Sequence, residues 1–364
     1  MLTLKSILSA MISAILLFFS SFGAVFDCST PAKPETGAGS PEWRQMVLDN
    51  YNEFISEVDG VDSRIPIIVS TDQHGAISAD SKFYEYIDSI VDWDRISAIL
   101  NLGDTVELTF NESELKDYAA ATKCLPADKR IENIGNHDRI LLNAKEGATI
   151  RDRYFNSLNS PNAEYSPDGS IFVVKDSQFG VRYLGVDLKE PGWGYQDGVL
   201  HSAQADYIIS VLSADDPSDI LLVSHAYLFR DAMLRRDGSS FTGSEYFIGG
   251  PDKYADVKQS FVDMLAARKT GGSGVLLDCD GGRHPYDFSA CEGELLMTLH
   301  GHHHTEGYET KDGITEFLFQ SMTKDNENDD EPDCFYFAYI DTETKTFKCW
   351  KNVFGYEAWE INIA

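Results

Sequence analysis

Short apolar runs rich in β-branched residues recur along the chain, and polar residues follow each of them. The clearest four cover residues 65–69, 96–100, 220–223 and 295–299. Runs of this length and composition predict strands that are buried on both faces, as in layered α/β proteins. Apolar residues at helical spacing occupy four segments between them, at 81–94, 113–124, 203–212 and 254–268. Strands thus alternate with helices, which predicts an α/β fold over most of residues 65 to 305.

The last part of the chain has a different pattern. Apolar and aromatic residues predict strands over residues 315–320 and 334–350, the latter with a hairpin turn at Asp341-Thr342-Glu343-Thr344. Residues about 229–292 contain several glycine clusters, including Gly271-Gly272-Ser273-Gly274. Such clusters are typical of flexible turns, so we predict a loop-rich insert around one helix.

Metal-binding side chains gather in five short segments, four of which directly follow the apolar runs. The segments are Ser70-Thr71-Asp72-Gln73-His74, Asn101-Leu102-Gly103-Asp104, Ile134-Gly135-Asn136-His137-Asp138, Val223-Ser224-His225 and Leu299-His300-Gly301-His302-His303-His304. Ligands of open α/β sheets lie beyond the carboxyl ends of the strands. We therefore expect the five segments to converge at one edge.

The residue types indicate a pair of metal ions. Asp72 and His74 lie two apart just past a strand, so both side chains face one side and can hold one divalent ion. Asp104 can place one oxygen on each of two ions, about 3.5 to 4 Å apart. Asn136, His225 and a histidine of the last segment complete the second ion. Mixed imidazole and carboxylate ligands suit zinc, iron or manganese better than calcium.

Each segment alone has an ordinary explanation as a turn, a helix cap or a solvated loop. In combination they resemble the calcineurin-like metallophosphoesterase superfamily, over residues of about 65 to 320. The ordered set is Asp-x-His, Gly-Asp, Gly-Asn-His-Asp, a lone His and Gly-His-x-His. The resemblance is to a secreted, bacterial-type member, and it implies a four-layer α/β/β/α sandwich with two central mixed β-sheets flanked by helices.

The resemblance also implies a role for each site residue. The first metal would be held by Asp72, His74, Asp104 and His304, and the second by Asp104, Asn136, His225 and His302. His137 would lie beside the scissile phosphate, with Asp138 orienting it. Two divalent transition-metal ions, Mn, Fe or Zn, would generate a bridging hydroxide that attacks phosphorus in line.

The chain departs from the family pattern at four positions. Glu107 stands where the second motif has aspartate, and the purple acid phosphatase branch has tyrosine there, so we exclude that branch. Ser224 precedes the lone histidine in place of the usual glycine. His300 and His303 are additional, and we predict His300 to be buried and His303 to be exposed.

We predict an exported phosphoesterase, with a small phosphorylated or nucleotide substrate and a slight preference for phosphodiesters. Aromatic residues would either stack on a base or sugar or pack in the core; they lie at 191–195 and at Tyr227, Phe229, Phe241, Tyr246 and Phe247. Three alternatives stay open: a phosphomonoesterase, a metal-binding surface attachment protein without turnover, and a mononuclear zinc hydrolase.

The charge of the chain argues against some partners. The 364 residues include 30 Lys and Arg and 59 Asp and Glu, a formal net charge of −29. A surface this acidic repels nucleic-acid backbones and anionic membranes, so we expect no duplex nucleic acid as partner. The sequence does not indicate an oligomeric state.

The chain begins with a pattern typical of a targeting segment. Residues 1–26 carry a single charge, at Lys5, before a long apolar run, which predicts a signal peptide and a secreted or cell-surface protein. The uncharged stretch 6–26 is also near the roughly 20 residues that span a bilayer, so an uncleaved membrane anchor is the alternative. Residues 27–41 read as a linker, and the metallophosphoesterase domain would cover 42–364.

Six cysteines fit an oxidising compartment. Cys279 and Cys291 flank one loop, and Cys334 and Cys349 flank the predicted terminal hairpin, so each pair could form a disulfide. Unpaired buried thiols are about as probable, since sequence does not give connectivity.

Overall fold

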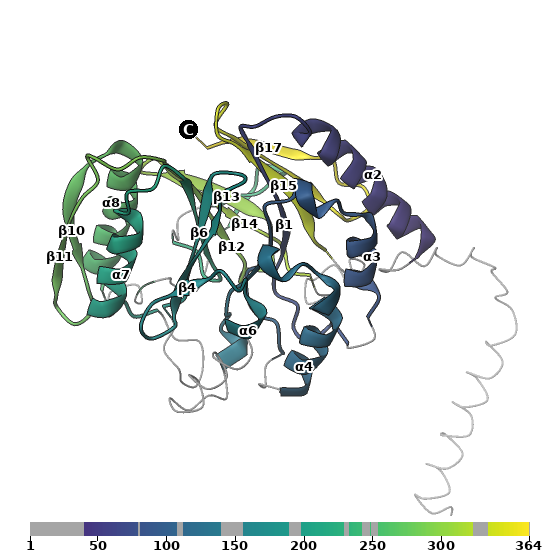
Figure 1. Cartoon of the computed structure of the whole chain (residues 1–364), viewed down its shortest axis with the longest axis horizontal. Helices are drawn as coiled ribbons and strands as arrows, with labels where there is room; N and C mark the ends of the chain where they lie inside the picture. The colour runs from purple at the N-terminus through teal and green to yellow at the C-terminus, as the bar shows by residue number, and fades with distance from the viewer. Residues whose placement is uncertain are drawn as a thin grey trace, which may run out of the picture. The chain divides into compact units, whose positions relative to one another are not determined.

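The computed structural model describes residues 40–78, 81–107, 112–139, 156–188, 198–228, 233–241, 248, 254–322 and 334–363. These residues belong to one compact unit, Gly37–Ala364. Two mixed β-sheets lie face to face in its centre, and helices cover their outer faces (Figure 1). The layer order is therefore α/β/β/α, which confirms the four-layer sandwich.

One sheet has six strands in the order β17-β16-β15-β1-β2-β3. Their bounds are β1 Arg64–Ser70, β2 Ala98–Asn101, β3 Arg130–Glu132, β15 Tyr336–Asp341, β16 Thr346–Lys351 and β17 Trp359–Asn362. β1, β2 and β3 are parallel, whereas β15 pairs with β1 antiparallel. The β15–β16 hairpin confirms the predicted turn at residues 341–344.

The other sheet has nine strands in the order β4-β5-β6-β7-β12-β14-β13-β8-β9. Their bounds are β4 Glu164–Tyr165, β5 Ile171–Asp176, β6 Val181–Val186, β7 Asp219–Ser224, β8 Met233–Leu234, β9 Ser240–Phe241, β12 Leu295–His300, β13 Gly307–Lys311 and β14 Ile314–Leu318. The four central strands, β6, β7, β12 and β14, are mutually parallel.

Alternate residues of the buried strands face different layers. In β1, Ile67 packs between the two sheets, whereas Ile68 packs under the outer helices. In β7, Leu221 and Leu222 divide in the same way between the inter-sheet core and the other outer core. Each such side chain stabilises the fold by about 1.5 to 3 kcal/mol relative to an exposed one. These strands are apolar at successive positions because both of their faces are buried, one against each core.

The helices form the two outer layers. α2 (Pro41–Val58) and α3 (Phe83–Ile90) cover the six-stranded sheet, and α4 (Glu112–Ala121) packs beside them. α7 (Ser202–Leu212) and α8 (Ala255–Thr270) cover the nine-stranded sheet, and α6 (Asn156–Leu158) is a single turn near β3. The four predicted helical segments correspond to α3, α4, α7 and α8.

Among the elements that the sequence pattern did not predict are helix α2 and a hairpin in the insert. α2 begins where we placed the end of the linker, because the Ser40 side chain accepts a hydrogen bond from the Trp43 N–H at 3.1 Å and Pro41 opens the helix. The insert also holds an antiparallel hairpin, β10 (Ser273–Leu277) and β11 (Arg283–Asp287). Gly271 ends α8 in the left-handed region at φ 72°, so the cluster predicted as flexible turns is partly a helix cap and partly a strand.

Neither predicted disulfide is present. Cys291 and Cys349 are thiols, so Cys279–Cys291 and Cys334–Cys349 are not bridged. The hairpin register places Ala338 opposite Cys349, four residues from Cys334 along the strand. Because consecutive strand residues advance by about 3.4 Å and a disulfide joins Cβ atoms about 3.8 Å apart, this register separates the two thiols.

Several predictions fall on residues outside those that the structure describes. They concern the targeting segment 1–26, most of the linker 27–41, the aromatic loop 191–195, and Phe229, Tyr246 and Phe247. Among the described residues, no helix combines the length and apolar character needed to cross a membrane.

Candidate metal centre

The predicted ligands lie together at one edge of the sandwich. Each follows the carboxyl end of a parallel strand: Asp72 and His74 follow β1, Asp104 follows β2, His225 follows β7, and His302 and His304 follow β12. Asn136, His137 and Asp138 follow β3. The convergence predicted from the strand-end pattern is therefore present, and both sheets contribute to it.

One group of donors consists of Asp72, His74 and His304. The two histidine Nε2 atoms are 2.9 Å apart, and Asp72 Oδ1 lies 3.3 Å from that of His304 and 3.9 Å from that of His74. Metal–ligand bonds of about 2.0 to 2.2 Å place neighbouring donors about 3 to 3.5 Å apart. Two of the three spacings are thus close to those around a bound ion.

A second group consists of Asp104, His225 and His302, with Asn136 beside them. His225 Nε2 lies 3.1 Å from Asp104 Oδ2, 3.0 Å from Asn136 Oδ1 and 3.1 Å from His302 Nδ1. His225 Nδ1 is 2.9 Å from the carbonyl oxygen of Leu102 and donates its proton there. Nε2 of the neutral ring therefore offers a lone pair, although it faces two oxygen acceptors.

These contacts fit a cation between the donors. If His225 were protonated at Nε2, one N–H would satisfy only part of the three surrounding acceptors, whereas a divalent ion can bind all four atoms. The Nδ2 atom of Asn136 is buried without a hydrogen-bond partner, so this amide is held with its oxygen toward His225 at the expense of its nitrogen. The donor set therefore matches a metal site in both chemistry and spacing.

The backbone at the centre is strained in the same places. Eight described non-glycine residues have positive φ, and five of them are predicted ligands: Asp72, His74, Asp104, His302 and His304, with φ between 46° and 75°. Such conformations cost about 1 to 3 kcal/mol each and cluster at functional sites. The surrounding contacts therefore hold the ligand loops in backbone conformations that these residues do not favour intrinsically.

Two motif glycines are required by close approach between these loops. A Cβ atom on Gly135 would lie 1.9 Å from Asp104 Oδ1, and one on Gly301 would lie 1.9 Å from Thr71 Oγ1. Any side chain at either position would push a ligand loop away. The glycines of Gly-Asn-His-Asp and Gly-His-x-His are thus packing requirements of the centre.

Asp138 holds two of the ligand loops together. Its Oδ1 accepts the backbone N–H groups of Thr105 and Val106 at 2.9 and 3.1 Å, and its Oδ2 accepts those of Asp104 and Gly135 at 3.0 and 2.8 Å. These contacts place it as a brace for the Asp104 loop. That it also orients the His137 ring stays a prediction.

His137 lies beside both of these groups and forms a third group of potential ligands with His74 and Glu107. Its Nε2 lies 3.9 Å from Asp104 Oδ2, its ring packs edge-on against His74 at 4.5 Å, and its side chain is 11% exposed. Its backbone N–H donates to Asp104 Oδ1 at 2.8 Å. Glu107, the departure from the family motif, lies 3.9 Å from His74 Nδ1 and can orient that ring from outside the centre.

The centre lowers the pKa of Asp72 and Asp104 but raises that of Asp138. Burial raises the pKa of Asp72, but the imidazoles of His225 and His304 more than offset it and hold the pKa at about 2. The same balance, again led by His225, lowers the pKa of Asp104. Burial, followed by the charge of Asp104, raises the pKa of Asp138 to about 7, against the opposing effect of its backbone donors.

The two additional histidines differ in burial. His300 is fully buried, as predicted, between Ser224 Oγ at 2.9 Å and Thr298 Oγ1 at 2.8 Å, and burial lowers its pKa to about 3. His303 is not exposed as predicted but partly buried, because its ring packs against Phe241 and Tyr227 at 5.2 and 5.7 Å between centroids. Neither belongs to the groups of potential metal ligands among the described residues.

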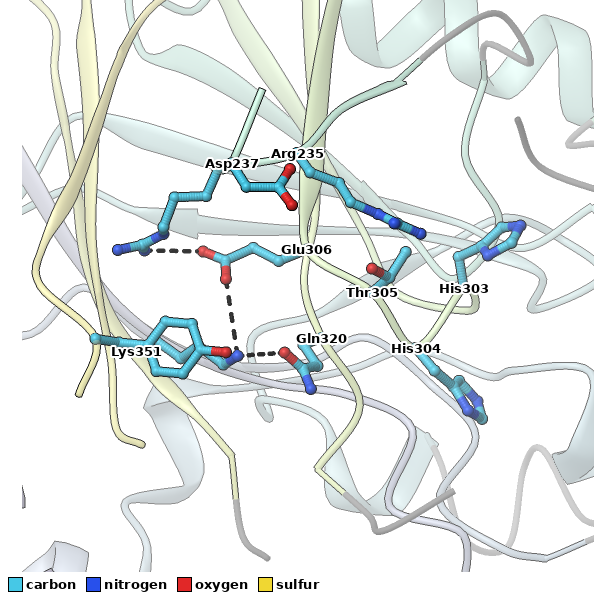
Figure 2. Close-up of a pocket in the computed structure, with 10 residues that line it drawn as sticks. Arg235, Asp237, His303, His304, Thr305, Glu306, Gln320 and Lys351 are labelled. Carbon is cyan, nitrogen blue, oxygen red and sulfur yellow. Dashed lines mark hydrogen bonds and ion pairs between the residues drawn. The ribbon is translucent and has the colours of Figure 1, made fainter. Parts of the chain in front are cut away.

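A polar cavity that sequence reasoning missed lies beside His304. Arg235, Glu306 and Lys351 line it together with His303 and other residues (Figure 2). The only sequence signal was the pair Arg235-Arg236, which we had taken as part of a loop. Its lining residues lie in the turn after β8, in the loop before β13, at the end of β16, and at Gln320 and Tyr356, so they come from different parts of the chain.

Comparisons with known proteins find only remote similarities, all of them to solved structures. No protein-family model matches the chain, and no curated protein matches it. Among solved structures, similarity is found to a conserved protein of Streptococcus pneumoniae described as a predicted phosphoesterase, with 13% identity, TM-score 0.34, and coverage of 82% of this chain and 97% of that one. PhoD has 10% identity and TM-score 0.45, covering 82% and 68%. GAP50, described as the anchor in the inner membrane complex of Plasmodium, has 11% identity and TM-score 0.41, covering 83% and 89%.

The sheet order, the parallel strands and the ligand loops at their ends decide the architecture. The fold resembles a calcineurin-like metallophosphoesterase sandwich. The predicted ligands Asp72, His74, Asp104, His225, His302 and His304 all occur in the groups of potential metal ligands. Asn136 joins the second group through His225.

Proposed function

We propose that the chain is a metal-dependent phosphoesterase that uses two divalent transition-metal ions, Mn, Fe or Zn, to hydrolyse phosphate esters. The observation that carries the proposal is the environment of His225 Nε2, which faces Asp104, Asn136 and His302 at 3.0 to 3.1 Å. Asp104 belongs to the second group, and we propose that it also binds the ion of the first group. Phosphodiester or nucleotide substrates are slightly favoured over monoesters.

The ions, when bound, would supply Lewis acidity and activate a water molecule for attack on phosphorus. The residues of the chain fix where this happens. Thr71 Oγ1 and the His302 N–H donate to Asp72 Oδ2 at 2.6 and 2.9 Å, which leaves Oδ1 directed toward His304. The Leu102 carbonyl fixes the His225 tautomer. Asp72 and His225 are thus each oriented by a second contact, as is usual for metal ligands.

His137 is the residue placed to act on the substrate. Its ring lies between the donor groups and retains some exposure, so a phosphate bound at this edge would contact it. Burial lowers the pKa of His137, which favours the neutral ring, and a ring N–H can hydrogen-bond to the leaving oxygen as charge develops there. Asp138 supports this position through the loop that it braces.

The proposal is tested by hydrolysis of bis-p-nitrophenyl phosphate with the full chain reconstituted with manganese. We expect turnover in the unaltered chain, none in Asp104→Asn, and unchanged turnover in Asp263→Asn, an exposed control on α8. Metal content should fall in Asp104→Asn only. Two bound metals without hydrolysis of any diester or monoester would refute the proposal and favour a binding protein, and one bound metal would favour a mononuclear hydrolase.

We also propose that the protein is secreted or held at the cell surface through residues 1–26. Support comes from the single charge and apolar run of that segment. Determination of the N-terminus of the protein recovered from its native cells tests this proposal. A new N-terminus near residue 27 indicates cleavage, an intact one in membranes indicates an anchor, and an intact one in the cytosol contradicts both.

A further inference from the structure

The cavity beside His304 is large enough for the part of a substrate that is attached to the scissile phosphate. Its volume is about 790 Å³, within the range of about 300 to 1,000 Å³ typical of small-molecule sites. Polar and charged residues line most of it: Arg235, Arg236, Asp237, His303, His304, Thr305, Glu306, Gln320, Lys351 and Tyr356. His304 is also a predicted metal ligand, so the cavity is continuous with the metal centre.

A fixed ionic network forms one side of this cavity. Glu306 lies 3.0 Å from Arg236 Nη2 and 3.9 Å from Lys351 Nζ. A dashed line in Figure 2 marks the contact between Glu306 and Lys351. Lys351 also donates to Gln320 Oε1 and lies 3.8 Å from the centre of the Tyr356 ring. The side chains of Lys351 and Glu306 are only 1% and 7% exposed. Buried charges with this many contacts have little freedom and form a rigid wall.

Arg235 differs from these residues because it is exposed and its guanidinium contacts an aromatic ring instead of a carboxylate. Its guanidinium stacks over the Phe241 ring at 4.9 Å and extends toward His303 (Figure 2). Among the described residues it makes no ion pair, and the neighbouring Asp237 carboxylate accepts instead from the N–H and Oγ of Ser239 at 2.8 and 2.6 Å. Stacking on Phe241 holds the guanidinium plane in place while its donors remain available.

The cavity is a positive site in a strongly acidic protein. Three lining cations, Arg235, Arg236 and Lys351, stand against two carboxylates, Asp237 and Glu306, which leaves a formal charge of 3 − 2 = +1. The whole chain carries −29. A guanidinium with free donors is suited to bind a carboxylate or phosphoryl group, often through two parallel hydrogen bonds.

We propose that this cavity is a second oxyanion subsite, in which Arg235 binds a carboxylate or phosphoryl group on the moiety esterified to the scissile phosphate. The inference rests on the proposed phosphoesterase function and specifies its substrate class. The preferred substrates carry a second negative charge, and the Glu306 network shapes the wall against which that charged moiety lies.

The test uses phosphonates, which occupy a metal centre without being hydrolysed. Calorimetry on the manganese-loaded full chain compares butylphosphonate with 4-phosphonobutyrate, in which a carboxylate replaces the terminal methyl group, and with shorter and longer homologues. Propane-1,3-bisphosphonate tests a phosphoryl group in the same place. The variants are Arg235→Ala, Arg235→Lys, and Arg283→Ala as an exposed control on β11.

We expect the second charge to strengthen binding by roughly tenfold at the best chain length, the lower end for a charge-assisted hydrogen bond. Arg235→Ala should remove this gain and leave butylphosphonate binding and metal content within about twofold. Arg235→Lys should retain part of it, and Arg283→Ala all of it.

An equal gain in Arg235→Ala, or no gain at any chain length while butylphosphonate still binds, would overturn the subsite but leave the proposed phosphoesterase intact. Failure of every phosphonate to bind the metal-loaded chain would overturn both proposals. The larger gain, with carboxylate or with phosphonate, identifies the group that Arg235 prefers.

Discussion

Replacement of Asp138 by asparagine tests whether this residue braces the metal centre. The two side chains have nearly the same shape, but only one oxygen of asparagine can accept hydrogen bonds. Each carboxylate oxygen of Asp138 accepts two buried backbone N–H groups, at 2.8 to 3.1 Å. Whichever way the amide turns, its NH₂ group therefore faces two N–H donors and leaves both without an acceptor.

The magnitude follows from this count. An unsatisfied buried donor costs about 1 to 3 kcal/mol, so two of them should lower the free energy of unfolding by about 2 to 6 kcal/mol. This is a large share of the 5 to 15 kcal/mol typical of a domain. Whichever pair of N–H groups loses its acceptor, at least one of them belongs to the Asp104 loop. Metal affinity should therefore also fall, by about 10- to 100-fold, as when other supporting contacts of metal ligands are lost.

Urea denaturation at pH 8.5 measures the first effect, since this pH lies above the raised pKa of Asp138, about 7. Metal titration of the refolded variant measures the second. Asp263→Asn, whose exposed carboxylate accepts only from Gln259 Nε2 at 2.8 Å, should change stability by less than about 0.5 kcal/mol. A loss below about 1 kcal/mol in Asp138→Asn, with unchanged metal affinity, would refute the bracing role.

Four further changes have defined outcomes. His137→Ala should keep both metals and lose about 10²- to 10⁴-fold in turnover, by steady-state kinetics. Gly135→Ala should lower the free energy of unfolding by about 1 to 3 kcal/mol and weaken metal binding, because its Cβ would overlap a ligand carboxylate. Burial lowers the pKa of His284, but hydrogen bonds to Asp278 at 2.8 Å and Asp206 at 2.6 Å raise it overall. The stabilisation that comes with this raised pKa is complete below pH 6.5 and is lost as the pH rises through the folded-state pKa. The free energy of unfolding should therefore be up to about 1 kcal/mol higher at pH 5.5 than at pH 9 through this group, and His284→Gln should remove that difference. Chelation should lower the melting temperature of the metal-loaded chain but not of Asp104→Asn.

The local pattern of apolar and polar residues was sufficient to predict the main strands and helices that support the centre. Runs such as 65–69 and 220–223 are apolar at every position because each strand faces two cores, and that property is visible in one dimension. The ligands follow these runs directly, so knowing the strands also placed Asp72, Asp104 and His225 at one edge. Helix α2 was not predicted, although its cap at Ser40 and its apolar residues at helical spacing, from Trp43 to Val58, were readable signals.

The tertiary structure decided everything that depends on which distant segments touch. Cys334 and Cys349 flank a hairpin in sequence, yet the strand register sets their separation. Asp138 looked like a partner of its neighbour His137, but four backbone donors from two loops converge on it. The cavity with Arg235 exists only because the turn after β8, the loop before β13 and the end of β16 come together beside the centre. Strand-end chemistry is local and so can be read along the chain, whereas hydrogen-bond saturation, register and cavity walls are set by long-range packing.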